Sequence, residues 1–368
     1  MMRMHELEAG VDRGRRGSRR APGGAATRQR LRIVVATTLL LLSPMLLSSA
    51  LPGRVRASSA RPRSEAPAVL SSTQNGDSLE VMSFNIRYGT ARDGDNVWDL
   101  RRSAVIEIIE TFRPDVLGVQ EALRFQLDEL VAVMPRYEEI GVGRTDGIEA
   151  GEYAAILVDR SRLKVLEQGT FWFSDTPEVP GSKSWGNDIT RICTWVRLRD
   201  RTSGRSFYTF NVHWDHQSQP SRVRSAELLM ERIGQRAAAA DPVLVTGDFN
   251  AGESNPAFQY LLGVVAAAPG RSPESGPRGA PDTSHGGERP VRLVDTFRTL
   301  HPDATDEGTF NGFEGRTDGD KIDAVLASGE WKVLAAEIVR AAPGGRYPSD
   351  HFPVVARVAL SRALNLRR

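Results

Sequence analysis

The chain has 368 residues, of which 40% are hydrophobic, so it is long enough to bury a sizeable core. Cys193 is its single cysteine, which excludes an internal disulfide and a cysteine-based zinc or redox site. The formal net charge is +2, but residues 1–57 carry +8 and the remainder carries −6. This mildly acidic remainder argues against a tight, non-specific nucleic-acid binder, although it does not exclude a nuclease.

The N-terminus has the three parts of a secretory signal. Residues 1–32 are rich in Arg and Gly, residues 33–47 are almost wholly apolar, and small residues follow at 48–50. The apolar run of about 15 residues is short for a membrane-spanning helix, which needs about 20. We therefore predict a signal peptide with a long basic n-region over 1–57, and a secreted or extracytoplasmic protein; an uncleaved membrane anchor is the alternative. The Ser-, Pro- and Ala-rich segment 58–77 is predicted to be a flexible linker.

Apolar periodicity predicts alternating strands and helices in the rest of the chain. Apolar residues at helical spacing predict helices over 101–111, 124–134 and 221–240. Apolar or alternating runs predict strands over 79–86, 115–119, 153–158, 169–173, 191–198, 207–212, 242–246, 321–327, 332–340 and 351–360. Because strand–helix pairs and strand hairpins recur in both halves, the pattern favours an α/β sandwich of two mixed sheets with helices outside.

One segment interrupts this pattern. Residues 263–290 are rich in Ala, Gly, Pro and Ser and have no periodicity, so we predict a disordered surface insertion. The folded domain is expected over 78–361, and residues 362–368 are expected to form a C-terminal tail.

Polar clusters follow several of the predicted strands. A strand end holds its side chains rigidly, and the loop beyond it is open to a substrate. Carboxylates, amides and imidazoles are the groups that hold a hard cation and act on a phosphate ester. The sequence therefore predicts one site built from distant parts of the chain. Its candidate members at the strand ends are Asn85, Glu121, Asn211, His213, Asp248, Asn250, Asp350 and His351.

Each acidic or amide cluster has more than one interpretation. Glu121 either caps the following helix or binds a metal, and the neighbouring clusters favour the metal. Asn85 can offer an amide oxygen to a metal or to an attacking water. Asp248 and Asn250 are two residues apart and leave a strand on the same side, so together they could orient a water and hold a phosphate oxygen. The alternative for this pair is an Asx turn that closes the strand.

Three of the six histidines lie in these clusters. Asn211 and His213 have the same two-residue spacing, and Asp215 and His216 continue on the following loop. His351 can exchange a proton near neutral pH.

Asp323 lies inside the apolar run 322–326, where an unpaired charge would be costly. It is therefore a candidate partner that fixes the tautomer of His351. A simple turn cap is the alternative for residues 349–351.

Together these clusters resemble the endonuclease/exonuclease/phosphatase superfamily over about residues 79–360. The resemblance is strongest to secreted bacterial members of unassigned substrate, through the motifs 171–174, Pro177, 181–183 and Trp185. It implies a four-layer α/β sandwich, with two mixed β-sheets packed face to face, helices on the outside and the site at the sheet ends.

The resemblance also implies a role for each site residue. Glu121 would be the main ligand for Mg²⁺, or for Mn²⁺, with Asn85 and Asp350 beside it. Asp248 would orient or deprotonate the attacking water, and Asp323 would support the acid/base residue His351. The scissile phosphate would be held, and its charge stabilised, by Asn250, Asn211 and His213. Further substrate contacts are expected from Asp215 and His216.

These expectations describe a secreted, divalent-metal-dependent phosphoesterase. A phosphodiesterase that uses in-line attack of an activated water is the favoured form. Nucleases, phospholipid phosphodiesterases and sugar- or inositol-phosphate phosphatases stay open, so the substrate could be a nucleic acid, a phospholipid or a phosphosugar. A non-catalytic module that binds phosphorylated ligands is the alternative outside enzymes. No stable protein partner is implied, and a monomer is expected.

Overall fold

The computed structural model describes residues 78–265 and 291–361. The predicted signal peptide, linker and C-terminal tail, and residues 266–290 of the predicted insertion, lie outside the described residues. Within these two ranges, no helix is both long and apolar enough to cross a membrane.

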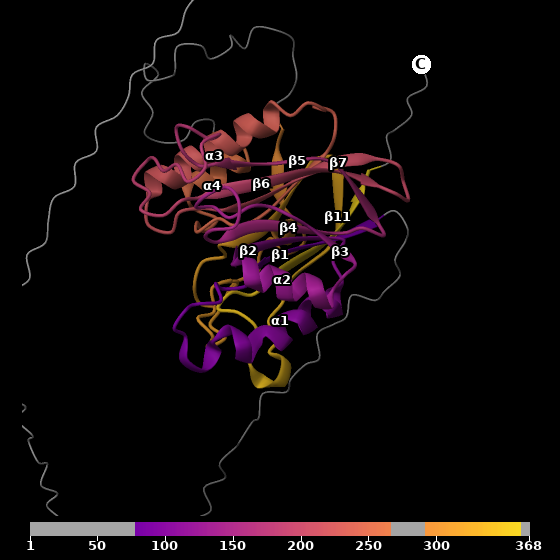
Figure 1. Cartoon of the computed structure of the whole chain (residues 1–368). Coiled ribbons are helices and arrows are strands. Elements are labelled where there is room, and N and C mark those ends of the chain that lie inside the picture. The colour runs from indigo at the N-terminus through magenta and orange to yellow at the C-terminus, as the bar shows by residue number, and fades with distance from the viewer. Residues whose placement is uncertain (1–77, 266–290, 362–368) are drawn as a thin grey trace, which may run out of the picture. The chain divides into compact units, whose positions relative to one another are not determined.

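The described residues form two six-stranded mixed sheets (Figure 1). The first sheet has the order β11 (Trp331–Ile338), β12 (Val354–Leu360), β1 (Ser78–Asn85), β2 (Val116–Ala122), β4 (Tyr153–Asp159) and β3 (Tyr137–Ile140). The second has the order β5 (Leu163–Trp172), β6 (Ile192–Asp200), β7 (Ser206–His213), β8 (Val243–Asp248), β10 (Asp323–Ser328) and β9 (Leu293–Asp295).

Each sheet contains one parallel pair near its centre. These pairs are β1–β2 and β7–β8, and every other neighbouring pair is antiparallel. The carboxyl ends of two parallel strands lie at the same edge of a sheet. The four strand ends Asn85, Ala122, His213 and Asp248 are therefore brought to two facing edges.

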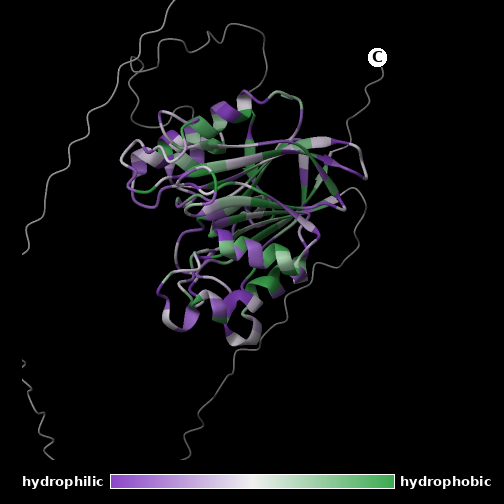
Figure 2. Ribbon diagram, in the orientation of Figure 1, coloured by the Kyte–Doolittle hydropathy of each residue, from purple (hydrophilic) through white to green (hydrophobic). Residues whose placement is uncertain are grey.

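Helices cover the outer face of each sheet and complete four layers, as predicted (Figure 1). Helices α1 (Trp98–Phe112) and α2 (Arg124–Val133) lie on the first sheet, and α3 (Gln219–Gly234) and α4 (Pro256–Leu261) lie on the second. Alternate residues of β1 pack on opposite sides: Val81 lies between the sheets, whereas Met82 packs under the helices. Figure 2 shows the corresponding green, apolar interior. The two-residue period of the strands thus produces three apolar cores.

The structure corrects the extent of several elements and adds four short ones. Strand β5 begins at Leu163 and helix α1 at Trp98, before the predicted starts at 169 and 101. Helix α3 ends at Gly234, so the prediction of a helix as far as residue 240 was too long. Beyond it, the guanidinium of Arg236 bonds to the carbonyls of Ile233, Ala239 and Asp241 and stabilises a non-helical turn. The elements β3, α4, β9 and α5 (Thr296–Leu300) were not predicted, because segments of three to six residues carry too few positions to show a period.

The two sheets are joined by the buried side chain of Asn211. Its Oδ1 accepts hydrogen bonds from Gln120 Nε2 at 2.6 Å and Thr246 Oγ1 at 3.0 Å. Its Nδ2 donates to the carbonyls of Val119 at 3.0 Å and Ala155 at 2.7 Å. A strand of the second sheet is thus hydrogen-bonded to two strands of the first, directly below the strand ends.

Gly118 lets the sheets approach closely at this point. A Cβ added to Gly118 would lie 2.1 Å from Thr246 Oγ1 and 2.7 Å from Asn211 Oδ1.

We expect Gly118→Ala to lower the free energy of unfolding by about 1–3 kcal/mol, because this core cannot accept the extra methyl group without moving. Urea denaturation followed by circular dichroism measures the change. Gly329→Ala is the control, since nothing lies within 4 Å of its added Cβ; equal losses in both variants would contradict the steric argument.

Candidate active site

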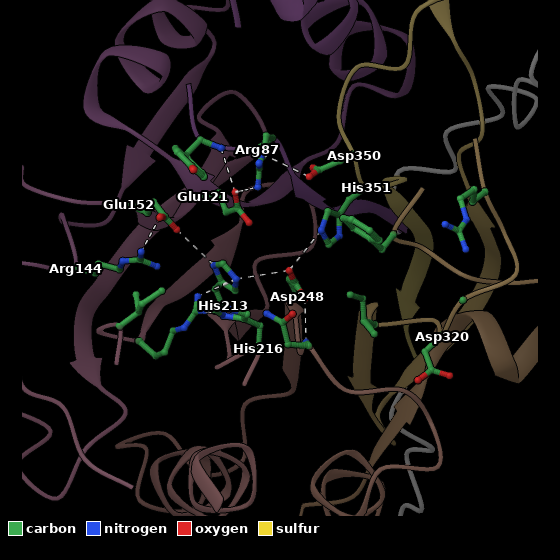
Figure 3. A pocket seen from close by; sticks show the side chains of 18 of the residues that line it. Arg87, Glu121, Arg144, Glu152, His213, His216, Asp248, Asp320, Asp350 and His351 are labelled. Carbon is green, nitrogen blue, oxygen red and sulfur yellow. Dashed lines mark hydrogen bonds and ion pairs between the residues drawn. The ribbon is translucent and has the colours of Figure 1, made fainter. Parts of the chain in front are cut away.

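The polar strand ends of both sheets line one cleft of about 640 Å³. Figure 3 shows side chains from the two sheets pointing into it, with Asp248 between His213 and His351. The predicted site residues that line this cleft are Glu121, His213, His216, Asp248, Asn250, Asp350 and His351. The structure does not bring four other predicted residues to the lining, namely Asn85, Asn211, Asp215 and Asp323.

Asn85 lies directly behind the cleft and bridges two carboxylates. Its Nδ2 donates to Glu121 Oε1 and to Asp248 Oδ2, both at 3.0 Å. Its Oδ1 accepts a hydrogen bond from the backbone N–H of Arg87 at 3.0 Å. In this arrangement the amide nitrogen of Asn85 faces and orients the two carboxylates; its role as a metal ligand stays a prediction.

Glu121 reaches the cleft through an unusual backbone conformation. Its φ is 63°, in the left-handed region, and the pairing of β2 with β4 shifts register between Gln120 and Ala122. A register irregularity of this kind re-aims a side chain at the end of a strand. In this position the Oε2 of Glu121 accepts a hydrogen bond from the backbone N–H of Tyr88 at 3.1 Å, while its Oε1 accepts the hydrogen bond from Asn85.

Asp248 is the buried centre of the cleft. Its Oδ1 accepts a hydrogen bond from the N–H of Asn250 at 2.9 Å, so the Asx turn that was the alternative for this pair is formed together with the cleft contacts. Its Oδ2 lies 3.6 Å from His213 Nε2 and 3.9 Å from His351 Nε2. Burial, with the nearby charge of Asp323, raises the pKa of Asp248 to about 7.

His351 and Asp323 form the pair that the sequence predicted. The Nδ1–H of His351 donates to Asp323 Oδ2 at 2.8 Å, so Nε2 is directed toward Asp248. Burial lowers the pKa of His351, but the carboxylates of Asp323 and Asp248 outweigh burial and raise it well above its usual value. The two carboxylates therefore favour the protonated form of His351.

The other histidines of the cleft are held by Arg191, which the sequence reasoning did not identify. Buried Arg191 contacts His213 Nε2 and His216 Nδ1, each at 2.9 Å, and Asp215 Oδ2 at 3.4 Å. A guanidinium only donates, so both imidazole nitrogens accept. The proton of His213 is then on Nδ1, which faces Glu152 Oε2 at 4.0 Å.

The charge state of His213 follows from this contact. Burial, followed by the charges of Arg191 and Arg144, lowers the pKa of His213 well below its usual value. His213 is thus a neutral acceptor beside Asp248, and Arg191 supplies the positive charge on this wall of the cleft.

Two predicted substrate-binding residues have structural partners instead. Asn211 is the buried link between the sheets, and all of its side-chain groups are hydrogen-bonded. Asp215 accepts the N–H groups of Gln217 and Ser218 on Oδ1, and its Oδ2 faces Arg191. Both residues therefore support the cleft from behind, and neither is part of its lining.

The cleft also contains charged and aromatic residues that the sequence reasoning missed. They are Arg87, Tyr88, Arg144, Glu152, Arg191, Phe310, Arg316, Asp318 and Asp320. Two of them could have been found from their positions in the sequence, because Arg87 follows Asn85 by two residues and Arg191 begins a predicted strand. Phe310 stands in an edge-to-face contact with His351, with ring centroids 5.2 Å apart.

The donor groups of the cleft fit a divalent cation. Glu121, His213 and Asp248 each offer one ligand atom, and these atoms all lie within 4.8 Å of one another. The carboxylate oxygens of Glu121 and Asp248 are suitable ligands for Mg²⁺ or Mn²⁺. His213 lies beside them, but its Nε2 accepts from Arg191 and its Nδ1 carries the proton, so it has no free lone pair for the cation. The second such group, Asp248 with Asp323 and His351, fits less well because His351 is protonated and its Nδ1–H bonds to Asp323.

A model of the Endonuclease/Exonuclease/phosphatase family matches residues 82–351. The chain belongs to this family. Among solved structures, an endonuclease/exonuclease/phosphatase from Bacteroides vulgatus is 29% identical, with a TM-score of 0.66 over 77% of this chain and 99% of that one.

Two further proteins are similar to this chain, and their descriptions differ from each other. A mannosyl-6-phosphatase from Bacteroides thetaiotaomicron is 28% identical, with a TM-score of 0.64 over 77% of this chain and 100% of that one. An uncharacterized protein of Acanthamoeba polyphaga mimivirus is 29% identical over 181 residues, which are 47% of this chain and 67% of that protein. The family and the fold are thus shown, whereas the relatives do not share one described substrate.

The charge of His351 depends on Asp323 and can be tested directly. We expect Asp323→Asn to lower the pKa of His351, because the neutral amide removes the nearest carboxylate. Imidazole NMR resonances, followed from pH 5 to 9, would show His351 losing its proton at lower pH in the variant. The resonances of His301, which lies outside the cleft and bonds to Ala336 O, are the internal reference. An identical titration of His351 in both proteins would contradict the assignment.

Proposed function

We propose that this protein is a divalent-metal-dependent phosphoesterase that hydrolyses its substrate by in-line attack of water. The observation that supports this most is the position of Asp248, a buried carboxylate beside Glu121 and between a protonated and a neutral histidine. These groups provide a base, a positively charged donor and a cation site within one cleft. Phosphoryl transfer requires that combination more than it requires covalent chemistry by the protein.

Asp248 is placed to act as the base. Its Oδ2 lies in the cleft, 3.6 Å from His213 Nε2 and 3.9 Å from His351 Nε2, where it can take a proton from the attacking water. As the water oxygen bonds to phosphorus, its proton moves to Asp248. The ester P–O bond breaks on the opposite side, and the leaving oxygen keeps the electron pair and takes a proton from solvent.

His351 and Arg191 are placed to offset the negative charge of the phosphate. His351 Nε2–H and the Arg191 guanidinium enter the cleft on opposite sides of Asp248, where they can donate to non-bridging oxygens. Glu121, with Asp248, would hold the cation. A bound Mg²⁺ or Mn²⁺ supplies further stabilisation of the charge that develops on the phosphate.

Loss of either key group should abolish turnover. We expect Glu121→Gln and His351→Ala each to reduce hydrolysis of bis-p-nitrophenyl phosphate by the full-length protein by at least about 10²-fold. EDTA should remove the activity, and added Mg²⁺ or Mn²⁺ should restore it. His301→Ala is the matched control outside the cleft, and thermal denaturation checks that each variant folds. Undiminished hydrolysis in either site variant, or activity unaffected by EDTA, would contradict the proposal.

A sugar phosphate is the substrate class that the outer part of the cleft favours. Phe310 is 49% exposed there, and Glu152, Asp318 and Asp320 also line the cleft. Carboxylates accept hydrogen bonds from sugar hydroxyls, and the arginines that pair with Glu152 and Asp318 can donate to them. The similarity to a mannosyl-6-phosphatase supports the same choice. The alternative is a phosphodiester, which is the substrate that the sequence favoured.

Phe310 provides the test of this substrate class. We expect Phe310→Leu to raise the KM for mannose 6-phosphate by up to about tenfold, because leucine keeps an apolar side chain but loses the aromatic face. The KM for p-nitrophenyl phosphate, whose leaving group is not a sugar, should change less. The wild-type protein is also assayed on bis-p-nitrophenyl phosphate and on single-stranded DNA. Preference for either diester over the sugar phosphate would contradict the sugar assignment and leave the phosphoesterase proposal in place.

A further inference from the structure

A second cavity lies at the end of the sandwich opposite the cleft. Its volume is about 390 Å³. Small-molecule sites in proteins have volumes of about 300–1,000 Å³, so a compact organic ligand fits here. The cleft is built at the carboxyl ends of β1 and β7, whereas Leu79 and Phe207, near the amino ends of the same strands, line this cavity. The proposed mechanism does not use it.

Both sheets contribute apolar walls to this distal cavity. Phe207 of the second sheet stands edge-to-face against Trp331 of the first, with ring centroids 5.3 Å apart. Leu79 and Leu360 add further apolar surface from the first sheet. Leu334, which is 41% exposed, continues the lining to the protein surface. An apolar chain bound here would remove these walls from water, which is favourable.

The charges of this lining are not balanced. Asp200 is the carboxylate of the lining, and Arg162 neutralises it, with Nε 3.0 Å from Oδ1. The two cations of the lining are Arg205 and Lys332. In the part of the chain that the structure describes, neither forms an ion pair with a carboxylate. The apolar cavity therefore carries uncompensated positive charge.

Arg205 is held beside the cavity by a backbone contact. It lies in the hairpin between β6 and β7, and its Nη1 donates to the carbonyl of Ser361, just beyond β12, at 3.0 Å. This hydrogen bond runs from one sheet to the other. It uses only part of the N–H donors of a guanidinium, so the others are available to an anion.

We propose that this cavity binds a free anionic amphiphile, a molecule with one apolar chain that ends in an anionic group. The chain would lie between Phe207, Trp331 and Leu360, and the anionic group would contact Arg205 and Lys332. Binding of this kind is independent of the proposed phosphoesterase activity, because no residue of the cleft takes part.

Charge favours this ligand over the other possible occupants. A neutral lipid would leave both cations without a partner, and a basic peptide would be repelled by them. The chain's own residues 362–368 follow directly after Ser361, but they contain three arginines and no acidic residue. An anionic group is the complement that the lining lacks.

Isothermal titration calorimetry of the full-length protein with decanoate, kept below its critical micelle concentration, tests this site. Decanol is the matched neutral ligand. We expect decanoate to bind about tenfold more tightly than decanol, because only decanoate pairs with the cations. Arg205→Gln combined with Lys332→Gln should remove this difference. Leu334→Ser should weaken both ligands by about threefold, because it removes apolar contact but no charge.

Lys164→Gln combined with Arg199→Gln is the matched control. These two cations are paired across β5 and β6 at the same end of the sandwich, and they lie outside the lining. Thermal denaturation checks that each variant folds. Unchanged decanoate binding in the Arg205 and Lys332 double variant, or an equal loss in the control double variant, would overturn the inference.

The chain's own C-terminal residues are tested as the competing occupant. If the wild-type protein does not bind decanoate, the inference is wrong. Binding that is then gained in Leu364→Ser combined with Leu366→Ser would assign the cavity to residues 362–368 in its place.

Discussion

The hydrogen bonds of the Asn85 amide join carboxylates that come from different sheets. Glu121 belongs to the first sheet and Asp248 to the second, and two ionised carboxylates repel each other unless a donor lies between them. Asn85 can bridge them only if the sheets keep a fixed spacing. That spacing depends on the glycine at position 118 and on the four hydrogen bonds of Asn211. The geometry of the cleft is therefore set by the packing of the sandwich below it.

In the site, each buried positive group lies next to at least one carboxylate. Asp323 and Asp248 flank His351, Asp215 faces Arg191, and the carboxylates around Arg87 share its guanidinium. Such pairing offsets the cost of burial, which would otherwise neutralise these groups. It also gives neighbouring residues of the same type different charges, as His351 and His213 show. The cleft can thus offer a protonated imidazole and a neutral one on either side of a single carboxylate.

The sequence predicted most of this arrangement, and its errors have physical reasons. Asp323 could be paired with His351 because a charge in an apolar run requires a partner. Asn211 was misplaced because residues two apart share a face, yet the earlier one lies roughly 6–7 Å deeper between the sheets. Alternation identifies the face of a strand but not the depth along it. Arg191 could not be recognised because its histidine partners are 22 and 25 residues away, and only the fold brings them together.

The left-handed backbone at Glu121 has a consequence for the stability of this chain. A residue with a Cβ in that conformation costs on the order of 1 kcal/mol, which glycine would not incur. Folding alone would thus favour glycine at a position where the proposed chemistry requires a carboxylate. Stability and activity make opposite demands on this residue, so a search for stabilising substitutions would select against the cation site. A more thermostable variant of this protein should therefore be checked at position 121 before it is assumed to work.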